Sequence, residues 1–355
     1  MNKKLNIAII GAGTIGNTHA ENLSKVSRAK IIWAIDIVEE KAKHLAAKYG
    51  IEKTSADYRD AYKDPDIDAV YICLPNYLHK PFTVEALGMG KHVFCEKPAA
   101  LSVAEARDMQ TAAEKNKKLC VIGVVNRFND YVNLIKKRIS AGEYGTIYHV
   151  HCVFKQFRSI PGLGGWFTEK KKSGGGVVID WGIHFLDLVL YCLDFPKLTS
   201  VNAVTNGSLG SGMKEYAFLS MWAGPPDYNG VYDVEEFASG MFRSAKTTIS
   251  LDGAWAHNIN EPAMYIDFIG DKGGLRHTYL KSFTSYFQKQ GILLTETAAI
   301  PDRNIFHNEE EDFVSCCLDN KQSKADIKTV IGSQAALDAF YKSAEQKKEV
   351  EIKDV

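Results

Sequence analysis

The first third of the chain alternates short apolar runs with longer segments in which apolar residues recur every three or four positions. The apolar runs cover residues 7–10, 31–35, 69–74, 92–95 and 119–125. Short runs of this kind, bounded by glycine, proline or polar residues, are typical of strands buried in a parallel sheet. Segments 38–49, 80–88 and 102–116 carry the helical period. The pattern therefore predicts a doubly wound α/β domain that ends near residue 125.

The pattern changes after residue 125. Residues 131–141 predict one more helix, and residues 146–154 then alternate, with Tyr148, Val150, Cys152 and Phe154 on one face. Further strand-like runs cover residues 199–206, 214–222, 234–241, 246–252 and 263–269, and helices are predicted at 308–319 and 328–345. Strands in succession imply a large, mostly antiparallel open sheet. We expect domains 1–125 and 126–355, with the C-terminal helix packing back near the first domain.

Three glycines follow the first apolar run at the spacing G-x-G-x-x-G. Gly11 would make a tight turn, Gly13 would let the backbone approach a pyrophosphate, and Gly16 would let the next helix lie close to the strand. The amide groups at the N-terminus of that helix would face the phosphates. The predicted cofactor contacts in this turn are Gly11, Ala12, Gly13, Thr14, Ile15 and Gly16.

An acidic residue at the end of the second apolar run supports this interpretation. Asp36 lies 20 residues after Gly16, where a carboxylate can accept hydrogen bonds from the adenosine ribose hydroxyls. It also repels a 2′-phosphate, and Ile37 and Val38 follow it in place of a basic residue. The sequence therefore favours NAD over NADP.

Polar residues follow two further strands at the edge where ligands bind in open α/β sheets. The segment after residues 69–74 places Asn76 and His79 where they would contact the cofactor, although His79 could equally be a helix N-terminal residue without a ligand. Lys97 follows the strand at 92–95 and precedes Pro98, which favours an extended backbone at Lys97. Lys97 would point toward the nicotinamide, where an amine suits proton exchange. The alternative is a surface lysine in a turn.

A second polar cluster lies on an otherwise apolar helix. Asp180, His184 and Asp187 follow at i, i+4 and i+7 and form one stripe. Burying such groups costs free energy unless they have partners. His184 could act as an acid/base oriented by a carboxylate. A structural hydrogen-bond network and a metal site are the alternatives, and the sequence offers no further ligand for a metal.

Charge and cysteine usage exclude several classes of protein. Lys plus Arg equals Asp plus Glu at 43 each, so the chain has no electrostatic footprint for nucleic acid or an anionic membrane. We found no apolar run of the ~18–20 residues that span a bilayer. The seven cysteines are scattered and lack ligand spacing, which predicts reduced, mostly buried thiols in a cytoplasmic protein.

The motifs together resemble the glucose–fructose oxidoreductase/inositol dehydrogenase/rhizopine catabolism (Gfo/Idh/MocA) family over essentially the whole chain. The segments that carry the resemblance are the glycine turn, Leu74-Pro75-Asn76 with His79, Glu96-Lys97-Pro98, and Gly174-Gly175-Gly176 with Asp180, His184 and Asp187. The family implies a Rossmann domain, a second α/β domain on a large, mostly antiparallel sheet, and NAD(P)-dependent chemistry at a carbinol carbon of sugars or cyclitols. Members of this family are commonly dimeric or tetrameric, so the resemblance also implies a homodimer or homotetramer.

The resemblance also implies roles for individual residues. The proton-transfer residues of the family match Lys97, Asp180 and His184. The cofactor residues beyond the glycine turn and Asp36 match Leu74, Pro75, Asn76, His79, Glu96, Lys97 and Asn126. Arg127, in the segment that resembles the family's cleft-closing stretch, and Arg158 could bind substrate hydroxyls or a carboxylate. Trp166 could stack on a pyranose or be a core aromatic.

We therefore expect a dehydrogenase that acts on a secondary alcohol of a sugar, glycoside or inositol. Two alternatives stay open at this stage. One is glycoside cleavage through transient C3 oxidation with NAD retained, and the other is a non-catalytic NAD-sensing module. The sequence does not identify the substrate, and it does not decide whether Lys97 or His184 is the immediate base.

Overall fold

The chain folds into two compact units. The structure is a computed structural model that describes residues 3–301 and 303–353. The first unit comprises Met1–Phe128 and Arg303–Ile331, and the second comprises Asn129–Asp302 and Gly332–Val355. This division differs from the expected domains 1–125 and 126–355, because helix α10 (Ile305–Asp319) belongs to the first unit. Phe313 and Val314 of α10 are fully buried in that unit's hydrophobic core.

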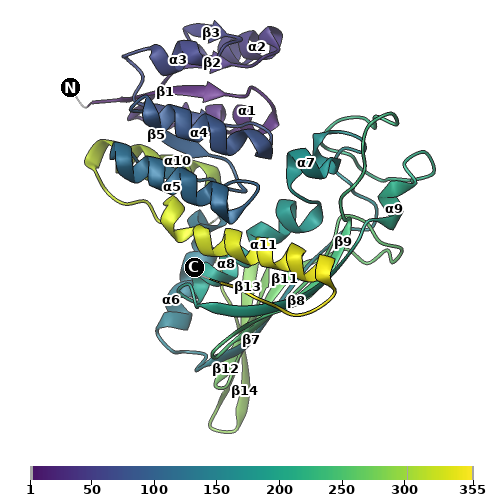
Figure 1. The fold of residues 1–355 in the computed structure, drawn as a ribbon. Coiled ribbons are helices and arrows are strands. Elements are labelled where there is room, and N and C mark those ends of the chain that lie inside the picture. The colour runs from purple at the N-terminus through teal and green to yellow at the C-terminus, as the bar shows by residue number, and fades with distance from the viewer. Residues whose placement is uncertain (1–2, 302, 354–355) are drawn as a thin grey trace. The chain divides into compact units, whose positions relative to one another are not determined.

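The first unit is built on a parallel sheet with the strand order β3-β2-β1-β4-β5-β6. Its strands are β1 Leu5–Ile10, β2 Ala29–Ile35, β3 Lys53–Ser55, β4 Ala69–Ile72, β5 His92–Cys95 and β6 Cys120–Ile122. Its helices, labelled in Figure 1, include α1 Thr14–Leu23, α2 Glu39–Tyr49, α3 Arg59–Lys63, α4 His79–Gly88, α5 Val103–Asn116 and α10. The strand order reverses beside β1, which is where open α/β sheets bind ligands. The predicted doubly wound domain is confirmed.

The second unit is built on a nine-stranded sheet with the order β14-β13-β12-β11-β7-β10-β9-β8-β15. The strands are β7 Ile147–Lys155, β8 Leu198–Asn206, β9 Phe237–Ser244, β10 Thr248–Ala254, β11 Ala263–Gly270, β12 Gly273–Thr278, β13 Ser282–Lys289, β14 Ile292–Thr297 and β15 Val350–Glu351. Neighbouring strands are antiparallel except β7 and β10, which are parallel. The predicted mostly antiparallel open sheet is confirmed.

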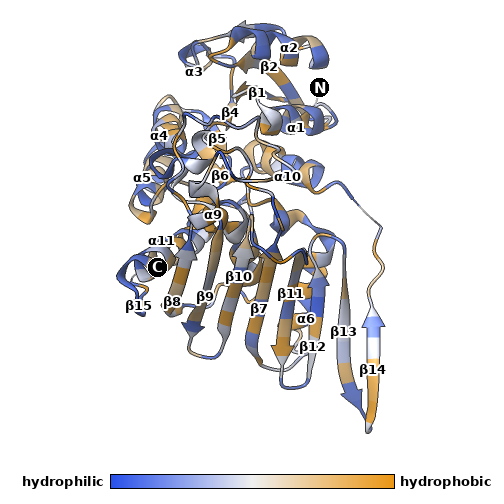
Figure 2. Ribbon diagram, turned by 90° about the vertical axis from the view of Figure 1, so that its right-hand side faces the viewer, coloured by the Kyte–Doolittle hydropathy of each residue, from blue (hydrophilic) through white to orange (hydrophobic). Residues whose placement is uncertain are grey.

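Helices of the second unit cover one face of this sheet. Those on this face are α6 Asp130–Ser140, α8 Ile183–Cys192 and α11 Ile331–Gln346, while the short helices α7 Lys170–Ser173 and α9 Ser208–Ser211 lie in loops (Figure 1). Helix α8 packs against β7, and α6 packs against α8. Figure 2 shows the sheet from its other face, with α6 and α11 behind the strands. Among the described residues of this unit, no helix covers the face toward the viewer.

A β-bulge accounts for one difference from the predicted alternation in β7. Val150, Cys152 and Phe154 are fully buried as expected, whereas Tyr148 is 52% exposed and Ile147 is buried. The pairing of β7 with β11 shifts register at this end of the strand. An extra residue in one strand inverts which side chains face the core, so Tyr148 turns outward.

Residues 214–222 do not form the predicted strand. Their backbone forms hydrogen bonds with an earlier loop outside any strand ladder: Leu219 N–H donates to Arg158 O at 3.0 Å. Leu219 and Trp222 are 75% and 52% exposed, so the apolar residues that suggested a strand do not line a sheet face. The strand prediction at 214–222 was wrong.

Strands β12, β13 and β14 were not predicted. Gly273 and Gly274 belong to β12, where a Cβ on Gly273 would lie 2.7 Å from the Phe287 ring. These glycines therefore allow close packing of a neighbouring strand.

Within the part of the chain that the structure describes, one helical run passes the length and composition test for a membrane span. Lys170–Cys192 is long and apolar enough, and 89% of its apolar window is buried inside the protein. The sequence analysis overlooked this run because Gly174–Gly176 and Asp180 interrupt it. Its burial is that of a core helix.

Candidate active site

In the turn after β1, glycine is sterically required at two of the three motif positions. Gly11 has φ +99°, and a Cβ there would lie 2.2 Å from the Cys73 carbonyl oxygen. A Cβ on Gly16 would lie 1.9 Å from the Gly11 carbonyl oxygen. Only glycine allows α1 to approach β1 this closely. The predicted roles of both residues in the turn agree with this geometry.

Gly13 differs from the other two glycines because no atom lies within 4 Å of the position of a Cβ. It is the N-cap of α1, and no side chain caps the helix there. The amide groups of the first helical turn, which include Thr14 and Ile15, are therefore not covered by a local side chain. Such a helix N-terminus favours an anionic group. The residues present here fit a dinucleotide pyrophosphate.

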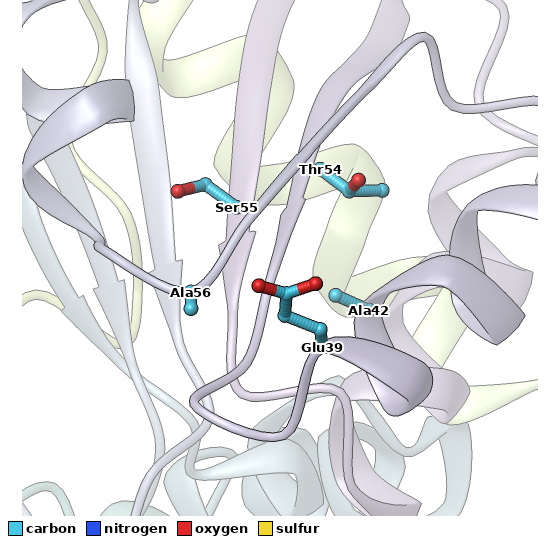
Figure 3. A pocket seen from close by; sticks show the side chains of 5 residues that line it. All are labelled: Glu39, Ala42, Thr54, Ser55 and Ala56. Atoms are coloured by element: carbon cyan, nitrogen blue, oxygen red, sulfur yellow. The ribbon is translucent and has the colours of Figure 1, made fainter.

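Asp36 is fixed at the end of β2 by two backbone amides. Its Oδ2 accepts a hydrogen bond from Ala12 N at 2.9 Å, and its Oδ1 accepts one from Val38 N at 2.9 Å. The structure therefore holds Asp36 against the glycine turn. A pocket of about 210 Å³ lies beside the start of α2, and the carboxylate of Glu39 points into it (Figure 3).

The segment after β4 is held by His79, whose side chain is fully buried. His79 Nδ1 lies 2.7 Å from the Pro98 carbonyl oxygen, and Nε2 lies 2.8 Å from the Leu74 carbonyl oxygen. Burial lowers the pKa of His79. Because both ring nitrogens face protein carbonyls, His79 joins the Leu74-Pro75 turn to the Pro98 loop. The ring does not present a free nitrogen to a cofactor, which differs from the predicted contact. The neighbouring Asn76 begins the turn η1 (Asn76–Leu78) and is also buried.

Glu96, next to Lys97, belongs to a buried chain of hydrogen bonds. Glu96 Oε2 accepts from Lys97 N at 3.0 Å, and Glu96 Oε1 lies 2.8 Å from His19 Nε2. His19 Nδ1 lies 2.6 Å from Glu310 Oε1, and Glu310 Oε2 accepts from the Tyr71 hydroxyl. These hydrogen bonds thus link Tyr71 of β4, through Glu310 of α10 and His19 of α1, to Glu96 and the backbone of Lys97.

The charges along this chain favour a protonated imidazole. Burial lowers the pKa of His19, but Glu310 and Glu96 outweigh it and raise the pKa to about 10. Burial raises the pKa of Glu96, yet its hydrogen bond and ion pair with His19 bring it below its usual value. His19 is therefore an imidazolium held between two carboxylates at neutral pH. The sequence analysis did not identify His19 or Glu310.

Glu309 lies next to Glu310 on α10 and behaves differently. Its side chain is fully buried, and neither carboxyl oxygen has a hydrogen-bond partner. Burial raises the pKa of Glu309 well above its usual range. Burial therefore favours the protonated form of Glu309.

Arg127 is placed differently from the sequence expectation. It lies with Asn126 in the short helix η2 (Val125–Phe128), and both side chains are buried. The Arg127 guanidinium donates to Lys324 O at 2.7 Å and to Thr329 Oγ1 at 2.5 Å. It therefore ties η2 to the segment 324–329 within the first unit. A substrate contact was expected from Arg127, and these internal bonds give it a structural role instead.

The second unit carries the Asp180–His184 stripe. Asp180 is buried in the π-helical turn η4 (Val178–Gly182), and its Oδ2 accepts a hydrogen bond from Trp255 Nε1 at 3.1 Å. His184 lies in the first turn of α8 and is partly exposed. Asp187 is buried and accepts a hydrogen bond from Ser333 Oγ of α11 at 2.7 Å. The two aspartates therefore have structural partners, and His184 is the member of the stripe that solvent reaches.

The π-helical turn was not predicted, because Asp180, His184 and Asp187 were expected to lie on one regular helix. Single π turns occur often at functional sites, since the extra residue changes the direction of the side chains that follow. Across residues 3–301 and 303–353, no group of three or more His, Cys, Asp or Glu side chains lies close enough together to hold a metal ion.

Two predicted substrate residues lie in the loop that precedes this helix. Trp166 is partly buried and stacks on Phe167 with ring centroids 3.9 Å apart, and Phe167 meets Trp222 edge-on at 5.0 Å. The Arg158 guanidinium donates to Asn258 Oδ1 and lies over the ring of Tyr216. Trp166 thus belongs to an aromatic cluster, and Arg158 is engaged with the neighbouring loop.

Comparison with known proteins places both units in one family. A family model described as an oxidoreductase family with an NAD-binding Rossmann fold matches residues 5–124, and the GFO/IDH/MocA C-terminal domain model matches residues 132–276. The structure resembles that of a levoglucosan dehydrogenase in complex with NADH and levoglucosan, with a TM-score of 0.86 over 99% of this chain and all of that chain. Sequence identity to that protein is 21%, so this likeness supports the fold alone.

Similarity to curated proteins is higher. The chain is 31% identical to the D-glucoside 3-dehydrogenase of Escherichia coli (strain K12) over 98% of its own length and 97% of that protein. It is 34% identical to the scyllo-inositol 2-dehydrogenase (NAD(+)) of Bacillus subtilis (strain 168) over 57% of each chain. The predicted resemblance is confirmed, and the chain belongs to the Gfo/Idh/MocA family of oxidoreductases with an NAD-binding Rossmann fold.

Proposed function

We propose that this chain is an NAD-dependent dehydrogenase that oxidises a secondary alcohol of a sugar, with a glucoside as the favoured substrate class. The full-length similarity to a D-glucoside 3-dehydrogenase supports the glucoside. The inositol dehydrogenase matches over a shorter part of the chain, so cyclitols rank second. The observation that carries the proposal is that the groups next to the predicted acid/base residues are anchored: His19 holds Glu96 beside Lys97, and Trp255 holds Asp180.

The cofactor site is proposed from the geometry of the first unit. The open position at Gly13 and the first amides of α1 would hold the pyrophosphate, and Asp36 would accept hydrogen bonds from the adenosine ribose. Leu74, Asn76 and Asn126 would line the remainder of the site, as the family resemblance implies. NAD supplies the hydride acceptor for the reaction.

The proton chemistry belongs to the chain's own side chains. His184 accepts the proton of the substrate hydroxyl, and Asp180 orients His184. The family resemblance assigns Lys97 to the proton transfer as well, and an ammonium group suits an oxygen on which negative charge develops. A partly exposed imidazole next to a buried, anchored carboxylate suits this division of roles.

The test is NADH formation on a panel of glucosides, free sugars and inositols. Lys97→Ala and His184→Ala should each lower kcat by about 10²–10⁴-fold, the usual contribution of one acid/base group, with the Kd for NAD little changed. Lys115→Ala and His44→Ala, on exposed faces of α5 and α2, are the matched controls. Near-normal turnover in either active-site variant would show that its assigned role is wrong.

The same panel separates the alternatives. Cleavage of a glycoside without NADH accumulation would identify transient oxidation in place of net dehydrogenation. Tight NAD binding without turnover on any substrate would identify a binding module.

We also propose that the protein is a cytoplasmic homo-oligomer that associates through the second unit. All seven cysteines are free and six are buried, which suits a reducing compartment. The edge strand β14 exposes three apolar side chains, Ile292, Leu293 and Leu294, at 60%, 83% and 41%. Figure 2 shows this apolar stretch at the end of the sheet. Exposed apolar edge strands are usually covered by a partner.

A further inference from the structure

The helix that carries Asp180 and His184 begins at an unusual cap. Helical residues run from Val177 through η4 into α8, and the first intrahelical bond joins Asp180 N to Gly176 O at 3.1 Å. The amide groups of the four residues before Asp180 therefore have no partner within the helix. Every helix has such amide groups at its start, and a buried helix must satisfy them elsewhere.

Two residues from distant parts of the chain bind all four amide groups. Glu235 Oε2 accepts from Gly176 N at 2.9 Å, its Oε1 accepts from Val178 N at 3.2 Å, and its backbone oxygen accepts from Val177 N at 3.1 Å. The Tyr341 hydroxyl accepts from Ile179 N at 3.1 Å and donates to Glu235 Oε1 at 2.8 Å. Both residues belong to the second unit, as the helix does.

The glycines before the helix make this cap possible. A Cβ on Gly175 would lie 2.2 Å from the Tyr341 hydroxyl oxygen, and a Cβ on Gly176 would lie 1.9 Å from the Glu235 carbonyl oxygen. Any larger residue would push the helix start away from Glu235 and Tyr341. Glycine at positions 175 and 176 is therefore required for contact with the cap.

The cap also connects to the partner of Asp180. Glu235 is followed by Glu236, whose backbone oxygen accepts from Trp255 N at 2.8 Å, and Trp255 Nε1 donates to Asp180. The backbone of residues 235–236 thus holds the helix start on one side and the partner of Asp180 on the other. Burial raises the pKa of Glu235, and its bonds to Tyr341 and the amide groups oppose that rise.

We propose that Glu235 and Tyr341 are positioning residues for the dehydrogenase reaction: they fix the start of the helix so that Asp180 and His184 stay in register with the substrate. The inference rests on the proposed function, since it assigns these two residues to the same reaction. Neither residue is expected to contact the substrate or cofactor. A shift of about 1 Å in a catalytic group can lower a rate by about 10²-fold, so a loosened cap should reduce kcat.

The adjacent pair Glu236 and Tyr232 offers a matched control. The Glu236 carboxylate accepts from Leu209 N at 3.0 Å, from Gly210 N at 3.1 Å and from the Tyr232 hydroxyl at 2.6 Å. Its bonding therefore copies that of Glu235, and its side chain is equally buried, but it caps α9.

The test compares Glu235→Gln and Tyr341→Phe with Glu236→Gln and Tyr232→Phe. Gln fills the same space but turns one acceptor into a donor, which opposes an amide N–H. Glu235→Gln should lower kcat by about 10–100-fold and Tyr341→Phe by about 3–10-fold, while KM for the sugar and for NAD changes by less than about 3-fold. Both control variants should keep kcat within about 3-fold of the wild type, because Glu236→Gln changes the side chain and keeps the backbone oxygen that accepts from Trp255 N.

Hydrogen exchange gives a second measurement that does not depend on turnover. The amide groups of residues 176–179 should be protected in the wild type and exchange faster in Glu235→Gln and Tyr341→Phe, with no change in the two controls. Unchanged protection, an equal loss of kcat in Glu236→Gln, or a rise in KM without a fall in kcat would each overturn the inference. A wild type without turnover would overturn the proposed function instead, and the exchange comparison would still decide whether this cap holds the helix.

Discussion

The buried imidazolium at His19 predicts a specific dependence of stability on pH. His19 is fully buried between Glu96 and Glu310, at 2.8 and 2.6 Å. In the unfolded chain the imidazole should titrate near 6.5, whereas in the folded protein its pKa is raised to about 10. At about 1.4 kcal/mol per pH unit, this difference corresponds to on the order of 5 kcal/mol of folding free energy.

The sign follows from which state holds the proton. Below pH 6.5 both states are protonated, and the stabilisation from His19 is fully present. Above pH 6.5 the unfolded chain loses its proton while the folded chain keeps it, so the free energy of unfolding falls by about 1.4 kcal/mol per pH unit until the pH reaches the folded pKa. Between pH 7 and pH 9 the expected loss is therefore about 3 kcal/mol.

Neighbouring acids titrate mainly in other windows. The pKa of Glu96 is lowered, so its contribution is present above pH 4.5 and is lost as the pH falls. The pKa of Glu309 is raised, so its contribution declines from pH 4.5 upward and can overlap with that of His19. Glu309→Gln removes this overlap and serves as the background for the comparison.

The assay must report the first unit separately, because a chain with two units need not unfold in a single step. Urea-dependent pulse proteolysis with mass spectrometry of peptides from β1 and β4 meets this need. In the Glu309→Gln background, the intact His19 site should lose about 3 kcal/mol between pH 7 and pH 9. Adding His19→Gln and Glu310→Gln, which removes both charges and keeps hydrogen-bonding groups, should flatten the curve in this range.

Two outcomes would refute the reasoning. Parallel pH curves for the two proteins would mean that His19 is not the group that holds the proton. A His19→Gln variant within about 1 kcal/mol of the wild type at pH 7 would also contradict it, because stranding buried carboxylates should cost about 3–5 kcal/mol.

Two further predictions follow from the glycine turn and the exposed edge strand. Gly13→Ala should leave Tm within about 2 °C of the wild type, because nothing lies within 4 Å of the new Cβ. The same variant should bind NAD at least about 10-fold more weakly in calorimetry, a loss of about 1.4 kcal/mol of binding free energy. Gly11→Ala, at φ +99° and with its Cβ 2.2 Å from Cys73 O, should lower the free energy of unfolding of the apoprotein by at least about 1–3 kcal/mol. A lower Tm for Gly13→Ala than for Gly11→Ala would contradict the steric argument. Leu293→Lys on β14 should shift the oligomer toward the monomer in analytical ultracentrifugation without changing Tm of the monomer, since the side chain is 83% exposed; an unchanged sedimentation profile would place the interface elsewhere.

The parts of the structure that the sequence predicts well are those fixed by local rules. The turn at Gly11 and the close approach at Gly16 depend on backbone atoms that lie near in sequence or in the adjacent strand, and a missing Cβ is visible in the sequence itself. Strands β1 and β4 are buried on both faces, so their apolar runs are unbroken. The orientation of Tyr148 was predicted wrongly, because a single-residue bulge has no local sequence signal.

Residues that hold other residues are harder to find, because their partners are far away in the chain. His19 and Glu310 are 291 residues apart, and Tyr341 lies 162 residues from the amide that it binds. A lone histidine on a helix carries no mark of such a pairing. Arg127 was misinterpreted for the same reason, since its acceptors at Lys324 and Thr329 lie 197 and 202 residues away.

Three of the buried polar residues that hold the candidate site do leave a trace in the sequence, which is a glycine opposite each of them. Glu235 and Tyr341 face Gly176 and Gly175, and Glu96 faces Gly123, where a Cβ would lie 3.0 Å from the carboxylate. In each case a buried acid or hydroxyl approaches a backbone closely enough to exclude a side chain. A glycine that follows a strand or precedes a helix, without a positive φ to explain it, can therefore mark the place where a distant polar group packs against the backbone. For this chain, that rule leads from Gly123 to the carboxylate beside Lys97, and from Gly175 and Gly176 to the cap of the helix that carries His184.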